Sequence, residues 1–306
     1  MSLTTCANEG KWFMTFIEKV QTQGLIFDGA LRTMLIQEGL DGSKSPEFWV
    51  LEKPGIIQAI HKAYFDAGAD IVTTNTFGAS AIRLQKSGLG SHAERINTLA
   101  VQIARAAGSE GKFVAGDIGP LRDLLVEPSG TISVDKAVDA FSEQAEALSM
   151  AGADVILVET LFDLNESLAA IKGIQSACSL PILAALTFLP TPSGEFATRM
   201  GHRVEVAMKT LRDAGAFAVG AKCAIGSGAM VDLAREIRDM VDVPVIIQPN
   251  AGIPEIKGSE TVYPESVEVF LKNIRIIKSE GVEIVGGCCG TTPEYIRTIS
   301  ETIRKH

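Results

Sequence analysis

Short apolar runs alternate with longer amphipathic segments along nearly the whole chain. Eight of the runs are rich in β-branched residues and have the length of buried strands, which predicts eight strands. They occupy residues 24–28, 70–75, 112–117, 154–159, 181–187, 216–222, 244–250 and 282–287. Between them, apolar residues recur at three- and four-residue spacing, as at Val138, Phe141, Ala145 and Leu148, which is typical of helices that bury one face.

Glycine marks the boundary between helix and strand in several of these units. The sequences are AGAD at 67–70 and 151–154, AGAF at 214–217 and EGVE at 280–283. In each, a glycine is placed to end a helix just before the chain enters a buried strand. Eight similar βα units without a break in composition predict an α/β fold, the (β/α)8 TIM barrel, in a single domain over residues 1–306. A doubly wound open sheet is the alternative, and residues 10–22 are expected to form an extra N-terminal helix at the bottom or side of the barrel.

Composition and charge narrow the class of protein. The net charge is −9 and the pI about 5.1, and such a surface repels phosphate backbones, so no nucleic-acid partner is expected. The start of the chain lacks the basic and apolar regions of a signal peptide. No apolar run reaches the roughly 18–20 residues of a membrane helix. These features predict a soluble, cytoplasmic protein with no membrane partner.

The five cysteines do not fit a disulfide scaffold, because their number is odd and no signal peptide precedes them. We therefore expect reduced thiols that are available as metal ligands or nucleophiles. Cys6 lies in an N-terminal stretch that is expected to be disordered, and Cys178 lies before a strand, on the amino-terminal side of the barrel. Neither is expected to belong to a site.

Polar or thiol groups follow nearly every predicted strand. In a TIM barrel the carboxyl ends of the strands form one rim, and that rim carries the active site. The rim residues are Asp28, Asn75, Asp117, Glu159, Thr187, Cys223, Gln248, Asn250, Cys288 and Cys289. Any one of them could instead cap a helix, bond to a loop or, like Glu159, form a salt bridge. The set as a whole predicts an active site.

Three of the rim residues predict a zinc site. Cys223 follows the sixth predicted strand, and Cys288 and Cys289 follow the eighth, so their sulfurs can converge beside the strand between them. Three thiolates suit a zinc ion whose fourth position stays open. The alternatives for the adjacent pair are a vicinal disulfide, a redox-active pair or two small buried hydrophobic side chains.

The residues around the pair fit the zinc interpretation. Gly286, Gly287 and Gly290 would permit the unusual backbone angles with which two adjacent sulfurs face one ion. The next helix is expected to begin at Thr291 or Thr292, with Pro293 as its first residue, so that its positive end stabilises nearby thiolates.

The motifs, in this order and spacing, resemble the zinc-dependent homocysteine S-methyltransferase family over nearly the whole chain. They are IFDGALRT (26–33), AGADIVTTNTFGAS (67–80), VAGDIGP (114–120), ADVILVET (153–160), KC (222–223), QPNAG (248–252), VYP (262–264) and GGCCGTTPEYI (286–296). The last motif is the most specific. The resemblance implies a (β/α)8 barrel that transfers a methyl group to a thiol, with Cys223, Cys288 and Cys289 as zinc ligands that act in catalysis through the metal.

The resemblance also implies homocysteine as the thiol and methionine as the product. Glu159 matches the position that holds the amino group of the substrate, and Asp28 matches another residue of the pocket. The turn at Gly29 can offer backbone amides to a carboxylate. Asn75 and Asn250 are further candidates for substrate binding.

Two motifs bear on the methyl donor. NTFGAS and GDIGP resemble the homocysteine-binding module of cobalamin-dependent methionine synthase, which implies methylcobalamin on a corrinoid protein or domain as the donor. Gly78 and Thr160 replace two tyrosines of the betaine-dependent branch, so betaine is disfavoured. An S-methylmethionine-dependent enzyme is the alternative. The chain is either a stand-alone subunit, which its start and end favour, or part of a larger enzyme.

One departure from the family concerns the acceptor. The family usually has Asn-Cys-Ser at the first zinc ligand, whereas this chain has Lys222, Cys223 and Ala224. Lys222 could stabilise the charge of the thiolate, or could bind an acidic group on a different substrate. A methyltransferase subunit of a corrinoid demethylation system, acting on another methylated compound or thiol, is therefore a further alternative.

Overall fold

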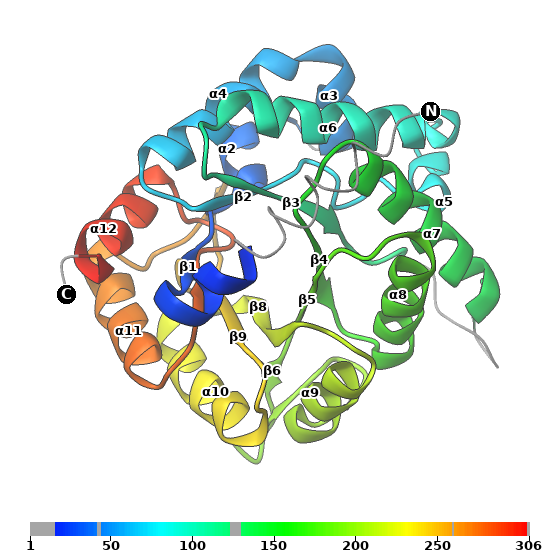
Figure 1. The fold of residues 1–306 in the computed structure, drawn as a ribbon. Coiled ribbons are helices and arrows are strands. Elements are labelled where there is room, and N and C mark those ends of the chain that lie inside the picture. The colour runs from blue at the N-terminus through cyan, green and yellow to red at the C-terminus, as the bar shows by residue number, and fades with distance from the viewer. Residues whose placement is uncertain (1–15, 42–43, 123–129, 259, 305–306) are drawn as a thin grey trace.

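Eight parallel strands form a closed barrel in the computed structural model, which describes residues 16–41, 44–122, 130–258 and 260–304 (Figure 1). The strands are β1 (Leu25–Ile26), β2 (Ile71–Thr73), β3 (Phe113–Ile118), β4 (Val155–Leu161), β5 (Ile182–Leu186), β8 (Ala218–Gly226), β9 (Val245–Asn250) and β12 (Ile284–Val285). They pair in the order β1-β12-β9-β8-β5-β4-β3-β2, and a parallel bridge between Phe27 and Ile71 joins the two edges. The predicted TIM barrel and its eight strands are confirmed, and the open-sheet alternative is wrong.

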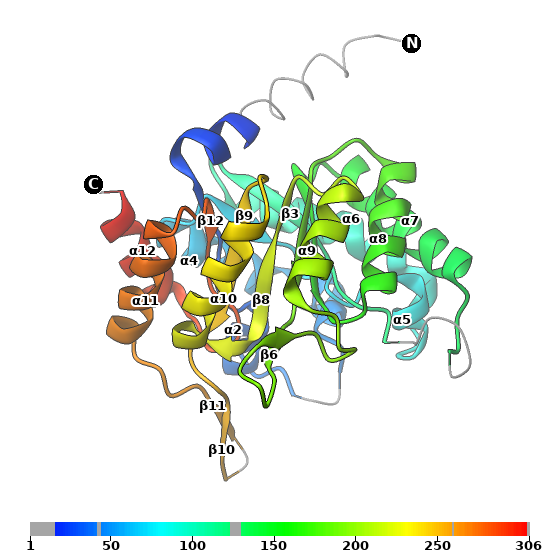
Figure 2. The ribbon, with the colours of Figure 1, turned by 90° about the horizontal axis from the view of Figure 1, so that it is seen from below.

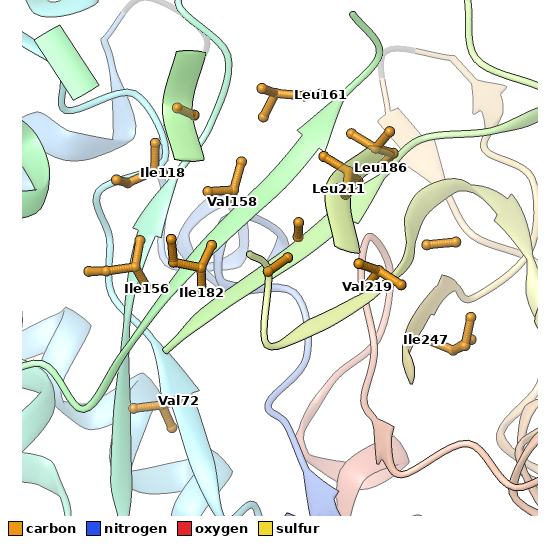
Figure 3. Close-up of a cluster of buried hydrophobic side chains, with 14 of the residues drawn as sticks. Val72, Ile118, Ile156, Val158, Leu161, Ile182, Leu186, Leu211, Val219 and Ile247 are labelled. Atoms are coloured by element: carbon orange, nitrogen blue, oxygen red, sulfur yellow. The ribbon is translucent and has the colours of Figure 1, made fainter. Parts of the chain in front are cut away.

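Helices surround the barrel on all sides (Figure 1). They are α2 (Leu31–Gln37), α3 (Trp49–Glu52), α4 (Pro54–Asp66), α5 (Ala81–Gln85), α6 (Ala93–Ala107), α7 (Val134–Met150), α8 (Leu164–Ala177), α9 (Val204–Asp213), α10 (Ser227–Met240), α11 (Val267–Ser279) and α12 (Pro293–Ile303), with 3-10 turns η1 (Pro46–Phe48) and η2 (Gly90–His92). Their apolar faces pack on the outward side chains of the strands, such as Val72, Ile156 and Val219 (Figure 3). None of the helices in the described ranges is long and apolar enough to cross a membrane.

Two short hairpins extend the carboxyl end of the barrel. Strands β6 (Leu189–Pro190) and β7 (Phe196–Ala197) follow β5, and strands β10 (Glu255–Lys257) and β11 (Glu260–Val262) follow β9. Both hairpins lie at the end opposite to the N-terminal helix (Figure 2).

The helix at 16–23 closes the amino-terminal end of the barrel. Phe16 and Val20 are buried and belong to the same apolar cluster as the inward side chains of the strands. The ring of Phe16 meets the edge of Phe113, with the ring centroids 5.4 Å apart. The predicted N-terminal helix is therefore present and covers the bottom of the barrel. The first six residues predicted for it, 10–15, lie outside the described residues.

The inward side chains change from apolar to polar along the strands. Because side chains alternate between the two faces of a strand, every second residue points into the barrel. The lower inward positions are apolar, as at Val155 and Leu157 of β4 and Ala218 of β8. The next inward positions along these two strands are Glu159 and, beyond Gly220, Lys222. The strand pattern therefore sets a polar layer on top of an apolar floor, at the carboxyl end where a TIM barrel has its active site.

Candidate metal and substrate site

Three sulfur atoms meet at the carboxyl end of the barrel. The Sγ atoms of Cys223, Cys288 and Cys289 all lie within 4.8 Å of one another. The Cys223–Cys289 distance is 3.8 Å and the Cys288–Cys289 distance is 4.0 Å. A tetrahedral zinc ion with Zn–S bonds of about 2.3 Å needs sulfurs roughly 3.8 Å apart, and these two distances match that spacing. The three thiols are free, and 4.0 Å is far too long for a vicinal disulfide, so that alternative does not apply.

A bulge in β8 directs Cys223 toward the other two sulfurs. The register between β8 and β9 shifts between Lys222 and Gly226, and both Cys223 (φ 70°) and Ala224 (φ 66°) adopt the left-handed conformation. Alternation alone would point Cys223 away from the barrel mouth, because Lys222 already points inward. The bulge re-aims the side chain, at a cost of about 1–2 kcal/mol for each left-handed residue.

Cys288 and Cys289 lie beyond the end of β12, so strand alternation does not apply to them. The Cys288 amide donates to the Pro249 carbonyl at 2.8 Å, and the Cys289 carbonyl accepts from the Ala251 amide at 2.9 Å. The turn that carries both cysteines is therefore fastened to the end of β9. The carbonyl of Cys288 also accepts a hydrogen bond from the Thr291 hydroxyl at 2.6 Å.

The three glycines around the pair have two different roles, which corrects the sequence prediction. Only Gly290 has a positive φ, of 83°. A Cβ at Gly286 would lie 2.6 Å from Cβ of Phe27, and one at Gly287 would lie 2.2 Å from Oγ1 of Thr291. Gly286 and Gly287 are thus required by close packing, not by unusual backbone angles. Helix α12 begins as predicted, with Thr292 at the N-cap and Pro293 as the first residue.

The thiols share their protons unequally. The pKa of Cys289 is lowered to about 3, because Cys223 and Cys288 donate to its sulfur. The pKa of Cys288 is raised, because it donates to the other two sulfurs and is buried. Cys289 is therefore the thiol of the cluster that ionises most readily.

A buried ion pair lies beside the thiols. Nζ of Lys222 is 2.6 Å from Oε2 of Glu159, and the two side chains are only 7% and 9% exposed. Burial alone would lower the pKa of Lys222, but the charges of Glu159 and Cys288 outweigh it and raise the pKa. Glu159 stands at a second bulge, where Thr160 has a φ of 57°. The salt bridge considered for Glu159 in the sequence is thus present, and Lys222 binds an acidic group of the protein itself.

Asp28 is held at the same level. Its carboxylate accepts from the Thr73 amide at 2.7 Å and from the Thr73 hydroxyl at 2.9 Å. Burial raises the pKa of Asp28 to about 7, although Lys222 and the bonds from Thr73 oppose this shift. Asp28 therefore bonds across to β2 and does not cap a helix.

The other residues predicted for substrate binding, Asn75, Gly29 and Asn250, differ in their contacts. The Asn75 side-chain amide donates to the Pro46 carbonyl at 2.8 Å, which fastens the 3-10 turn η1. Gly29 packs so tightly that a Cβ there would lie 2.7 Å from Oγ1 of Thr291. Asn250 is buried, and its Oδ1 has no hydrogen-bond partner among the described residues.

Comparison with known proteins shows which family the chain belongs to. The profile of the family described as Homocysteine S-methyltransferase matches residues 25–303. The chain belongs to the homocysteine S-methyltransferase family. Methionine synthase of Mycobacterium leprae (strain TN) is 28% identical over 98% of this chain. The chain spans 26% of the length of that relative.

Solved structures support the fold of this homocysteine S-methyltransferase family member. The metallated form of the homocysteine methyltransferase MmuM from Escherichia coli has a TM-score of 0.77 at 21% identity, covering 94% of this chain and 99% of that one. A methyltransferase from Methanosarcina mazei has a TM-score of 0.62 at 11% identity, covering 96% and 98%. At these identities the likeness shows the fold alone.

Two residues of the candidate site were missed by sequence reasoning. The Tyr263 ring packs on Gly290, and burial together with the charge of Cys289 raises the pKa of its hydroxyl. Its motif, VYP, was noted only as part of the resemblance. Thr73 donates to the Asp28 carboxylate. No signal in the sequence indicated this contact, because Thr73 lies in a β-branched run that is typical of an ordinary strand.

Proposed function

We propose that this chain is a zinc-dependent methyltransferase that transfers a methyl group to the thiol of homocysteine and so forms methionine. The observation that carries the proposal is the cluster of Cys223, Cys288 and Cys289, whose sulfur spacings fit one tetrahedral ion. Zinc held there would keep the sulfur of an acceptor thiol ionised at neutral pH.

The protein residues supply binding and orientation. The three cysteines hold the metal at the barrel mouth, where the polar layer can receive the tail of the acceptor. We assign this tail to the surroundings of Asp28, Gly29, Asn75, Glu159, Lys222 and Asn250. In the transfer, a lone pair of the acceptor sulfur forms the new S–C bond. The bond between the methyl group and its carrier breaks, and its electron pair stays on the carrier.

Methylcobalamin on a corrinoid protein or domain is the donor that we propose. The NTFGAS and GDIGP motifs support it, and so does the similarity to a methionine synthase over nearly all of this chain. S-Methylmethionine is the competing donor, and the same assay decides between the two.

Zinc content and methyl transfer test the proposal together. Purified wild type and Cys178→Ser should each hold one zinc ion per chain, because Cys178 lies at the end of α8, away from the cluster. Cys289→Ser should lose most of its zinc and its methyl transfer from methylcobalamin to homocysteine. Equal zinc content in all three proteins would contradict the proposed site. If methionine forms from S-methylmethionine but not from methylcobalamin, the donor is S-methylmethionine and the methylcobalamin proposal is wrong.

A further inference from the structure

Helix α10 begins directly after the bulge that carries Cys223, and a residue from a distant segment caps its first turn. The carboxylate of Glu265 accepts a hydrogen bond from the Ser227 amide at 3.2 Å and another from the Ser227 hydroxyl. Ser227 is the first residue of α10, and Gly226 at the N-cap has no side chain that could serve this purpose. A carboxylate here satisfies an amide that the helix leaves free, and the positive end of the helix stabilises its charge. Glu265 therefore fixes the point at which the chain leaves the bulge.

The bulge needs such a restraint, because its backbone is strained at Cys223 and Ala224. Two consecutive left-handed residues other than glycine persist only where their surroundings hold them. Before the bulge, Lys222 pairs with β9, and the pairing resumes at Gly226. The carboxylate of Glu265 packs so closely there that a Cβ on Gly226 would lie 2.9 Å from Oε2. Glu265 thus supplies the side-chain contact on the helix side of the strained segment.

The backbone of Glu265 is tied to the turn that carries the other two thiols. Its amide donates to the Ala251 carbonyl at 3.0 Å, and the Ala251 amide donates to the Cys289 carbonyl at 2.9 Å. Its carbonyl accepts from the Tyr295 hydroxyl at 2.5 Å, and Tyr295 belongs to α12, the helix that follows the turn. The side chain of Glu265 therefore contacts the chain after Cys223, while its backbone is linked to the chain of Cys289.

The spacing of the sulfurs depends on contacts of this kind, because the two thiol segments follow strands that do not pair with each other. Strands β8 and β12 both pair with β9, and the sulfurs of Cys223 and Cys289 lie 3.8 Å apart beyond it. Residues that orient metal ligands without touching the metal typically account for about 10- to 100-fold in metal affinity. A residue that joins the bulge to the 288–289 turn is expected to have an effect of this size.

We propose that Glu265 is a positioning residue of the thiol cluster. Through Ser227 it keeps the sulfur of Cys223 within bonding distance of an ion that the 288–289 pair also binds. This inference rests on the proposed function, because it takes zinc to be that ion. Glu265 is not itself a candidate ligand: within the described ranges, the group of side chains that could hold a metal ion consists of the three cysteines.

Metal binding by two matched variants tests this role. Glu265→Ala removes both bonds to Ser227, whereas Asp154→Ala removes a carboxylate that accepts from the Val114 amide at 2.7 Å and from Arg105 at 2.6 Å. Asp154 directly precedes β4, so it lies at the amino-terminal end of the barrel, opposite to the thiols. Zinc affinity, measured by competition with a chelator, should fall about 10- to 100-fold in Glu265→Ala and stay within about twofold of wild type in Asp154→Ala.

The spectrum of the cobalt-substituted protein separates positioning from general stability. Cobalt(II) occupies tetrahedral thiolate sites, and its thiolate-to-metal charge-transfer absorption depends on how many sulfurs bind it. At saturating cobalt, this absorption should be weaker in Glu265→Ala than in wild type, because Cys223 is no longer held within bonding distance. Asp154→Ala should have the wild-type spectrum. Glu265→Gln keeps one oxygen for the Ser227 amide, so its zinc affinity and spectrum should lie between those of wild type and Glu265→Ala.

The outcomes separate this inference from the proposed function. If wild type binds neither zinc nor cobalt, the proposed metal site is wrong, and the inference is wrong with it. If wild type binds both and Glu265→Ala has the same affinity and spectrum, the inference is overturned and the metal site stands. Equal losses of zinc affinity in Glu265→Ala and Asp154→Ala would indicate general destabilisation and would also overturn it. If Glu265→Ala does not fold, wild-type affinity and spectrum in Glu265→Gln are the result that overturns the inference.

Discussion

The ring of Tyr263 lies directly against Gly290, so that a Cβ on residue 290 would come within 2.3 Å of the ring carbon Cγ. The same glycine has a φ of 83° and its amide donates to the Thr33 hydroxyl at 3.1 Å. Residue 290 follows the last of the three thiols. The contact therefore links the position of one of the three clustered sulfurs to the segment after the β10–β11 hairpin.

Gly290→Ala should destabilise the protein and weaken zinc binding. Gly201 is a matched control, because its φ is 84° and an added Cβ there would have no heavy atom within 4 Å. Gly201→Ala should cost about 1–2 kcal/mol from the backbone conformation alone. Gly290→Ala should cost more, because Tyr263 must also move. Urea denaturation and zinc competition with a chelator measure the two effects. Equal costs at the two positions would show that the ring contact has no influence.

The Lys222–Glu159 pair should show strong energetic coupling. Lys222→Met and Glu159→Gln should each destabilise the zinc-loaded protein by about 3–5 kcal/mol, because each removes one partner and leaves the charge of the other buried and unpaired. The double variant should lose much less than the sum. Arg203 and Glu195 form the control pair, at 2.8 Å but 70% and 57% exposed. Their coupling should not exceed about 1 kcal/mol. Additive losses at the buried pair would contradict its role.

His61 should make the protein sensitive to mild acid. Burial lowers the pKa of His61 to about 4, and neither ring nitrogen has a hydrogen-bond partner in the described part of the chain. Because the unfolded chain takes up a proton below about pH 6.5 and the folded protein does not, stability falls as the pH drops from 6.5 toward 4. The loss between pH 7.5 and 5 should be about 2 kcal/mol.

His61→Leu should remove this part of the acid sensitivity and should stabilise the protein at pH 5. The exposed His92 is the control, and His92→Leu should leave the pH dependence as in wild type. The free energy of unfolding from urea titrations at pH 7.5 and 5 gives the comparison. A difference between wild type and His61→Leu that is the same at both pH values would contradict the assignment.

The strands and the polar rim could be predicted from the sequence because both depend on local patterns. Runs of β-branched residues ended by Gly, Asp or Asn give strand positions, and the fold then brings their ends together. The thiol cluster could be predicted for the same reason. Cys223 and the 288–289 pair follow two strands, β8 and β12, that both pair with β9. The (β/α)8 arrangement needed no information beyond the number and similarity of the units.

The pairing of side chains inside the barrel could not be predicted, because it depends on register. Whether Lys222 meets Glu159, a thiolate or a ligand is set by how β4, β5 and β8 are staggered, and no short motif encodes that. The left-handed angles at Cys223 and Ala224 also lack a local signal, because neither residue is glycine. In contrast, Gly286 and Gly287 looked like sites of unusual angles and are instead positions of close contact.

The small inward residues under the charged layer act as spacers. Ala185 lies beside Glu159 in the register of β4 and β5, and Gly220 lies beside Ala185 in that of β5 and β8. A Cβ on Gly220 would come within 1.8 Å of the Ile246 carbonyl oxygen, so this position cannot grow. Ala185 already carries a Cβ and is fully buried among the inward side chains of the strands. Changes in acceptor size, natural or engineered, should therefore arise at residue 185, where a larger side chain would take up space beside Glu159 in the polar layer.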